Sequence, residues 1–481
     1  NLLLLLLLLT CSLNGTTVVK ARRIQASDFS VLEQVLESWN GFADGKTWSP
    51  NSDCSTVQGI TCDTSGYVVS LSTSGNNLRA FIPDEISGLQ HLTFLSITTS
   101  RLVGYLPSGL FNLPLLKGLQ LSTNLLYGAI PDDISKLSSL TYLNLNENYL
   151  FGPLPQALSH LGQLVSLNLV GNMLMETIPS VIGSITTLQK LDLSATGMLG
   201  TIPDWISTMP RLISLQIRGN YLNGSIPASL SRLTQLTTLD IGKNRYLEGS
   251  IPAELFNLLK LEELNLEKSG LNGTIPASLG ALSRLSILQL AWSNISGTLP
   301  SSIGSLTHLD VLYLESMHLT GTVPRSYSNL QNLGLLLMNR NSLSGDMYGI
   351  TSTMTNLLTL DVSSNQFTGR LPAPPSSRLQ FYYAHRNYFS HGTVVPPKNN
   401  LTFYSNVFQN CLLNASMVAG AYERQRSAEE CAAFCGVAAG DARPLCSGHG
   451  MCSFNASVQE SACTCDSNFD NQAGPHSCAY S

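Results

Sequence analysis

Residues 212–235 read LISLQIRGNYLNGSIPASLSRLTQ, and the same 24-residue unit recurs along most of the chain. In general form it is L-x-x-L-x-L-x-x-N-x-L-x-G-x-I-P-x-x-L-x-x-L-x-x. Its proline returns in steps that are multiples of 24, apart from one step of 25, at Pro83, Pro107, Pro131, Pro155, Pro179, Pro203, Pro227, Pro252, Pro276, Pro300, Pro324 and Pro372. Tyr348 stands where one further proline is expected. A period held this long predicts a solenoid of thirteen stacked coils, which we number from Pro83 to Pro372.

Each part of the unit has a structural interpretation. The alternating leucines predict a short strand with leucines inward and the intervening residues outward. The asparagine predicts a side chain that satisfies backbone groups where the chain leaves the strand, at Asn76, Asn124, Asn148, Asn172, Asn220, Asn244, Asn341 and Asn365. The glycine predicts a positive φ or a close backbone approach. The one extra residue, between Asn244 and Leu247, predicts a bulged turn in an unbroken stack.

The L-x-G-x-I-P segment carries a family resemblance. The chain resembles plant-type leucine-rich repeat proteins, which include receptor-kinase ectodomains, receptor-like proteins and polygalacturonase-inhibiting proteins. The resemblance implies an α/β-type leucine-rich repeat solenoid, with a parallel sheet on the concave face and short helical or irregular segments on the convex side. Because the repeated residues are structural, the resemblance specifies the fold better than the ligand.

Composition and cysteine count favour a secreted chain over a nucleic-acid-binding one. Only 12% of the 481 residues are charged and the net charge is −5, so no basic footprint for nucleic acid is present. The run Leu2–Leu9 is too short to cross a bilayer and predicts a signal segment over residues 1–26, which we expect to be incomplete at its start. Removing Cys11 with that segment leaves ten cysteines, which predicts five disulfides.

An amino-terminal cap is predicted over residues 27–66, ahead of coils at 67–390. One helical face of its first segment carries Phe29, Leu32, Val35, Leu36 and Trp39. Cys54 and Cys62 follow in CSTVQGITC, which resembles the cap of plant leucine-rich repeat proteins and implies a disulfide between them. A terminal coil needs such a cap because its leucines are otherwise exposed.

The carboxy-terminal part is rich in cysteine. Cys411 and Cys431 bracket a segment that resembles a carboxy-terminal cap, expected over 391–434. Residues 435–481 resemble an EGF-like module through CSGHGMC and a C-x-C pair. Six cysteines allow fifteen connectivities; the resemblance implies pairs Cys435–Cys452, Cys446–Cys463 and Cys465–Cys478.

Patterns for catalysis are weak, and those for glycosylation are strong. The sequence has no G-x-S-x-G and no H-E-x-x-H, and Gly45-Lys46-Thr47 lacks the spacing of a phosphate loop, so we expect no enzyme activity, metal or cofactor. Glycan acceptors are predicted at Asn223, Asn272, Asn294, Asn400, Asn414 and Asn455, although the repeat pattern itself generates the first two.

By resemblance, the chain is expected to be a receptor-like protein or receptor-kinase ectodomain at the cell surface or wall. It would bind an extracellular peptide, hormone, protein or co-receptor, and reach a membrane only through a segment outside this chain. The alternative is a secreted, polygalacturonase-inhibitor-like binder of an extracellular enzyme.

Ligand binding is predicted on the inner sheet of coils 7–11, where outward residues align in columns. The candidates are Arg218, Asp240, Lys243, Glu267, Lys268, Gln289, Trp292, Tyr313 and Glu315. Trp292 leads this set, because an outward Trp leaves a large apolar area wet and Trp, Tyr and Arg anchor interfaces. The competing interpretation is that Lys268 merely lies across Trp292 as a cation–π pair.

Overall fold

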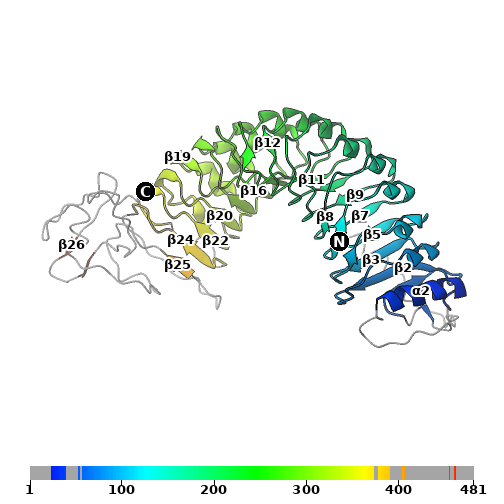
Figure 1. Ribbon diagram of the computed structural model, residues 1–481. Coiled ribbons are helices and arrows are strands. Elements are labelled where there is room, and N and C mark those ends of the chain that lie inside the picture. The colour runs from blue at the N-terminus through cyan, green and yellow to red at the C-terminus, as the bar shows by residue number, and fades with distance from the viewer. Residues whose placement is uncertain are drawn as a thin grey trace, which may run out of the picture.

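The chain forms an arched solenoid in a computed structural model (Figure 1). The structure describes residues 23–39, 53–54, 57–372 and 378–389, together with the backbone of the short strands 404–406, 454–455 and 460–461. Residues 1–22 of the predicted signal segment, most of the carboxy-terminal cap and all of the EGF-like region apart from those two short strands therefore lie outside the described residues.

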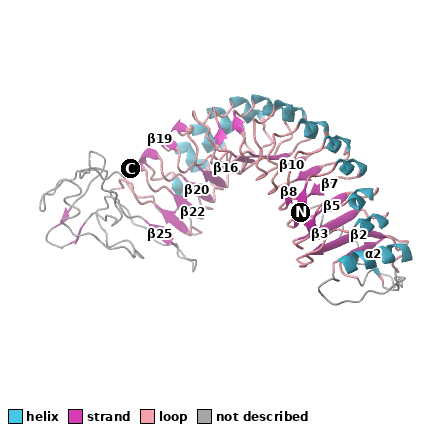
Figure 2. Ribbon diagram, viewed as in Figure 1, coloured by secondary structure: helices cyan, strands magenta, loops and turns pink. Residues whose placement is uncertain are grey.

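One sheet of sixteen strands lines the inner face of the arch (Figure 2). Its strands in spatial order are β1 (Ile60–Cys62), β2 (Val68–Ser74), β3 (Phe94–Thr98), β5 (Gly118–Gln120), β7 (Tyr142–Asn144), β9 (Ser166–Asn168), β10 (Lys190–Asp192), β11 (Ser214–Gln216), β13 (Thr238–Asp240), β15 (Glu263–Asn265), β16 (Ile287–Gln289), β18 (Val311–Tyr313), β20 (Leu335–Leu337), β22 (Thr359–Asp361), β24 (Phe381–Tyr383) and β25 (Tyr404–Asn406). All neighbours are parallel except β1 and β2. This confirms the predicted fold class.

The outer edge of the arch carries one 3-10 helix per coil (Figure 2). These are η2 (Asp84–Gly88), η3 (Ser108–Asn112), η4 (Asp132–Lys136), η5 (Gln156–His160), η6 (Ser180–Ser184), η7 (Asp204–Thr208), η8 (Ala228–Arg232), η9 (Ala253–Asn257), η10 (Ala277–Ala281), η11 (Ser301–Ser305), η12 (Arg325–Asn329) and η13 (Thr351–Thr353). In coils 1–11 the repeat proline directly precedes the helix, and its carbonyl accepts the amide three residues on, as from Ile86 to Pro83 at 3.2 Å. Proline fixes φ there and needs no donor of its own.

Shorter strands form a lateral face between the inner sheet and the helices. They are β4 (Val103–Gly104), β6 (Leu125–Gly128), β8 (Tyr149–Leu150), β12 (Asn223–Gly224), β14 (Tyr246–Leu247), β17 (Ser296–Thr298), β19 (His318–Thr322), β21 (Ser342–Asp346) and β23 (Gln366–Thr368). Each repeat glycine here has a positive φ, for example +95° at Gly104. A Cβ at Gly104 would also collide with the Phe81 ring, so glycine is required on both grounds.

The repeat asparagines satisfy backbone groups after the strand, as predicted, and also link neighbouring coils as a ladder; at Asn76 the side chain bonds the Thr73 hydroxyl instead. The Asn124 Nδ2 donates to the carbonyls of Ile97 and Leu121 at 2.7 and 3.1 Å. Its Oδ1 accepts the amides of Ser100 and Leu102 at 3.1 and 3.0 Å. Because these polar groups are buried, the amide side chain satisfies groups that water does not reach. Asn148, Asn172, Asn220, Asn244, Asn341, Asn365 and Asn387 make equivalent bonds.

The extra residue in coil 8 leaves the stack intact. Paired residues of strands β13 and β15 are 25 positions apart in the sequence, whereas those of β15 and β16 are 24 apart, as in the other coils. The Leu247 amide closes a local turn onto the Asn244 carbonyl at 3.1 Å. The bulge is therefore absorbed in the turn, as the sequence predicts.

At the amino end, helix α2 (Ala26–Ser38) packs against η2 of the first coil. Phe29, Leu32, Val35 and Trp39 are buried, and the Trp39 indole donates to the Phe81 carbonyl at 2.9 Å. Cys54 and Cys62 form a disulfide with Cα atoms 5.9 Å apart. Buried Asp28 accepts the Val68 amide at 2.7 Å, which ties the helix to the first parallel strand. Among the described residues, no helix has the length and apolarity that a membrane span requires.

Candidate functional site

The inner sheet of coils 7–12 brings the predicted binding residues onto one surface. Strand pairing aligns Gln216, Asp240, Asn265, Gln289 and Tyr313 in a single column, one residue per coil. The amides of Lys243, Lys268 and Trp292 bond the carbonyls of Glu267, Ala291 and Glu315, which fixes the two neighbouring columns in the same way. The predicted columns are therefore formed. We call this surface the concave site.

Arg218 is the centre of an ion-pair cluster that spans three coils. Its Nη2 lies 2.5 Å from the Glu267 Oε1, and its Nη1 lies 3.6 Å from the Asp240 Oδ2. Both carboxylates are largely buried, whereas the Arg218 side chain is 30% exposed. Burial raises the pKa of Asp240, although the Gly242 amide and the Arg218 guanidinium partly offset it. The guanidinium therefore compensates two desolvated carboxylates at once.

The sequence placed Glu267, with Asn265 and Ala291, at outward positions, and here the structure differs. All three side chains are buried. The Asn265 Oδ1 accepts the Glu267 amide at 3.1 Å, which holds the turn after β15 close to the sheet. Arg218 then lies across Glu267 from two coils away. A ligand would therefore meet the Arg218 guanidinium, which covers Glu267, rather than the Glu267 carboxylate itself.

Trp292 is the largest exposed side chain of the concave site, with 45% of its surface in solvent. The Lys268 Nζ lies 5.9 Å from its ring centroid. The Arg340 guanidinium lies 5.8 Å from it. The contact with Lys268 is the one that the competing interpretation predicted, and the contact with Arg340, from coil 12, was not predicted. Two cations hold the ring in place and leave part of its apolar surface wet.

The backbone helps to present Trp292. Its φ is +59°, and Lys243, Lys268, Ser316 and Arg340 have the same left-handed conformation at the same place in their coils. Non-glycine residues seldom adopt it. The position recurs in coils outside the site, as at Thr123, so it belongs to the fold rather than to the ligand. Sequence periodicity reveals the column but not this conformation.

Glu315 lies beside Trp292 and lacks full compensation. Its Oε2 is buried without a hydrogen-bond partner. Burial raises its pKa, partly offset by hydrogen bonds from its own backbone amide and from the Trp292 side chain; Glu267 and Asp361 raise it further. Burial, Glu315 and Glu267 likewise raise the pKa of Tyr313. The site thus combines an aromatic surface, two cations and an undercompensated carboxylate, which suits recognition of a polar peptide or protein segment.

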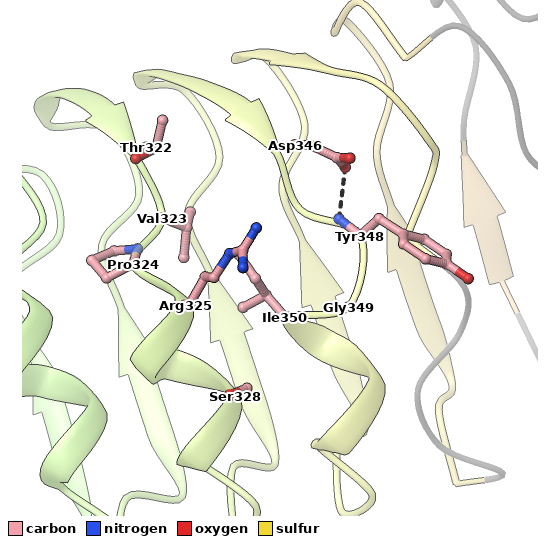
Figure 3. Close-up of a pocket in the computed structure, with 9 residues that line it drawn as sticks. All are labelled: Thr322, Val323, Pro324, Arg325, Ser328, Asp346, Tyr348, Gly349 and Ile350. Carbon is pink, nitrogen blue, oxygen red and sulfur yellow. Dashed lines mark hydrogen bonds between the residues drawn. The ribbon is translucent and has the colours of Figure 1, made fainter.

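A second depression lies on the lateral face between coils 11 and 12 (Figure 3). Its volume is about 640 Å³, and the Arg325 side chain extends into it (Figure 3). It opens where Tyr348 replaces the repeat proline, because η13 then begins later and is only three residues long. Within the described part of the chain, no group of His, Cys, Asp or Glu is placed to hold a metal ion. The pocket therefore offers space without evident reactive chemistry.

The comparisons with known proteins agree with this architecture. A family model described as Leucine rich repeat matches residues 186–245, and a second one matches 139–161 and 356–377. The chain contains leucine-rich repeats and folds as a solenoid of them. A probable leucine-rich repeat receptor-like protein kinase of Arabidopsis thaliana is 37% identical over 73 residues, which are 15% of this chain and 8% of that protein. Receptor-like protein 3 of Arabidopsis thaliana is 38% identical over 64 residues, 13% of this chain and 8% of that protein.

Solved structures cover more of this chain. The plant peptide hormone receptor RGFR1 in complex with RGF2 superposes with a TM-score of 0.65 and 29% identity, over 74% of this chain and 60% of that one. The PEPR1–AtPEP1 structure superposes with a TM-score of 0.64 and 30% identity, over 81% of this chain and 59% of that one. An LRR protein of Leptospira interrogans superposes with a TM-score of 0.53 and 28% identity, over 66% of this chain and 84% of that one. The chain thus spans about 60% of these plant receptor chains and a small part of its curated relatives.

Proposed function

We propose that this chain is the extracellular recognition region of a receptor-like protein or receptor kinase, and that its concave site binds a peptide or a peptide-like segment of a partner. Trp292 carries the proposal, since it is a large aromatic side chain that is nearly half exposed and contacts the cations of Lys268 and Arg340. Aromatic side chains of this kind dominate interface energetics when a partner buries them. The solved neighbours named above include a plant peptide hormone receptor with its ligand, which supports the same class of partner.

Binding, rather than catalysis, is the activity that the site supports. The carboxylates with raised pKa lie on the strand surface and face a guanidinium or an indole, rather than a cleft that excludes water. The leucine-rich repeat ectodomain fold is typically non-enzymatic. We place the protein at the cell surface, with glycans at Asn223, Asn272 and Asn294, whose side chains are all exposed.

The test is selection of peptides on the immobilised full chain, followed by affinity measurement with variants. Trp292→Ala is expected to weaken a selected peptide at least tenfold, about 1.4 kcal/mol, because the partner loses its main apolar contact. Tyr142→Ala, on the inner sheet of coil 4, is the matched control and should bind normally. Equal affinity of the Trp292→Ala variant and the parent would reject the concave site.

The same experiment separates the alternative function. An inhibitor-like protein would select no short peptide but would bind a folded extracellular enzyme and lower its activity. Binding of such an enzyme that survives Trp292→Ala would replace the receptor proposal.

A further inference from the structure

The lateral face carries exposed apolar side chains in each of coils 1–6. They are Phe81, Tyr105, Leu125, Tyr127, Tyr149, Phe151, Met173, Met175 and Leu199. We call these nine residues the lateral patch. From coil 7 onward the residue before the repeat glycine is Asn223, Glu248, Asn272, Ser296, Thr320, Ser344 or Thr368. Exposed Tyr221 and Tyr246 adjoin the patch in coils 7 and 8, where the first predicted glycan acceptor, Asn223, also lies.

The patch is continuous rather than scattered. The rings of Tyr105 and Tyr127 meet edge-to-face with centroids 4.6 Å apart, and strand pairing sets Tyr127 beside Tyr149. A bridge pairs Phe151 with Met173. Further contacts extend the surface at both ends, since the Phe81 ring lies over Gly104 and the Met175 side chain lies over Gly197.

The area of the patch exceeds what a monomer ordinarily exposes. Nine side chains of this size, each about half exposed, leave about 800 Å² of mostly apolar surface in solvent. The largest apolar patch on a typical monomer is about 300–600 Å². A stable interface buries about 800 Å² on each partner. The patch therefore has the size of one complete half of an interface.

The order of residue types along the patch makes it complementary to itself. Aromatic Phe81 and Tyr105 lie in coils 1 and 2, and Met175 and Leu199 lie in coils 5 and 6. A two-fold axis between coils 3 and 4 sets aromatic rings of one copy against the Met and Leu side chains of the other. Sulfur–aromatic contacts are favourable, and a two-fold interface needs the same surface on both copies.

The exposed charges beside the lateral patch also favour the antiparallel arrangement of two copies. Exposed Arg101 lies in coil 2 and exposed Glu176 in coil 5, so antiparallel pairing brings opposite charges together. A parallel arrangement would bring like charges together, which is unfavourable. Coil 7 of one copy would lie beside the amino-terminal cap of the other, and the glycan acceptors of coils 9 and 10 would lie farther from the interface. We propose that the lateral patch is the interface of an antiparallel homodimer, with coils 1–6 of each copy facing coils 6–1 of the other.

The test is the solution mass of the secreted full chain, measured by light scattering and sedimentation over a range of concentrations. We expect a mass that rises to that of two chains, and a single-chain mass for Phe151→Glu, which places a charge near the two-fold axis. Leu259→Glu is the matched control, because Leu259 is an exposed leucine outside the patch; it should dimerise like the parent. Circular dichroism checks that each variant is folded.

A charge exchange locates the contact. Tyr127→Lys and Phe151→Glu should each be monomeric alone, yet form a mixed dimer when combined, because the introduced lysine of one copy would face the introduced glutamate of the other. A parent chain that stays monomeric at every concentration overturns the proposal and leaves the patch for a different partner. A dimer that persists in both variants overturns the assignment of the interface to this face. Neither result bears on peptide binding by Trp292, so failure here is distinct from failure of the proposed function.

Discussion

Coils 1–6 and coils 7–12 share one backbone architecture but present different surfaces. On the inner sheet, the column is uncharged at Gln120, Asn144 and Asn168 in coils 3–5, whereas Asp192 in coil 6, Asp240 in coil 8 and Asp361 in coil 13 carry charge. On the lateral face, coils 1–6 expose Phe, Tyr, Leu and Met side chains, whereas later coils expose mainly Asn, Ser and Thr, apart from Tyr221, Tyr246 and Tyr348. Because the repeated Leu, Asn, Gly and Pro positions hold the backbone, the other positions are free to separate two kinds of interaction surface along one solenoid.

Individual coils also differ in how they are tied together. Coils 3, 4 and 5 have the buried asparagine, as do coils 7 and 8, whereas coils 9 and 10 have Ser269 and Ser293, whose hydroxyls bond only a local carbonyl. The part of the concave site around Trp292 thus lies where the ladder between coils is interrupted. This difference gives the largest expected effect on stability.

Asn172→Ala should destabilise the protein by about 3 kcal/mol, because it leaves the buried Leu150 amide without its partner and removes the bonds to the Leu145 and Leu169 carbonyls. Ser293→Ala removes one local hydrogen bond and should cost about 1 kcal/mol. Denaturant unfolding of both variants measures the difference. Equal losses would show that the asparagine ladder ties the coils together no better than the local serine bond does.

Arg218→Ala should cost about 1–2 kcal/mol, since Asp240 and Glu267 lose the guanidinium that compensates them. Lys243→Ala, which removes an exposed cation of the next coil, is the control and should be near neutral. The deficit of the Arg218 variant should shrink as the pH falls, because burial raises the pKa of Asp240 and protonation neutralises that carboxylate. A deficit that stays constant between pH 7 and acid would indicate lost packing instead.

Glu315→Gln should stabilise the protein slightly at neutral pH. A carboxyl whose pKa is raised on folding holds more protons in the folded than in the unfolded chain, so stability falls as the pH rises through the folded pKa. The gain should therefore be present above that pKa and disappear below it. Thermal unfolding against pH measures it, with Glu262→Gln as the exposed control; a variant less stable than the parent at neutral pH would contradict the assignment.

Glycan occupancy should affect stability least. Enzymatic release of N-glycans from the secreted chain should convert Asn223, Asn272 and Asn294 to Asp, because all three side chains are exposed on the polar part of the lateral face. Peptide mass mapping detects the conversion. Three unmodified asparagines in a plant host would mean that this face is covered or that the chain is not glycosylated.

The sequence predicts the fold well because the repeat is redundant. The alternating leucines, the asparagine bonds and the positive φ of Gly104, Gly128 and Gly152 all follow from one unit. Even the lapse at Tyr348 is local, where it shortens η13 and opens a pocket.

The candidate site is predicted less completely, for a physical reason. Columns follow from the period, but contacts depend on how far a long side chain reaches along the stack. Arg218 reaches Glu267 across 49 residues, and Arg340 reaches Trp292 from two coils away. The repeat period does not specify which residue a long side chain contacts two coils away. The cysteine pairs assigned by resemblance beyond residue 389 stay predictions, since they lie outside the described residues.

The most direct measurement is hydrogen–deuterium exchange of the full chain with and without a peptide selected on it. Protection on binding should concentrate between residues 238 and 340, over strands β13 to β20 of the inner sheet, where Trp292 and its flanking cations lie. The lateral strands β4, β6 and β8 should exchange equally in both states. Protection confined to those lateral strands, or to the inner sheet of coils 1–5, would contradict the account.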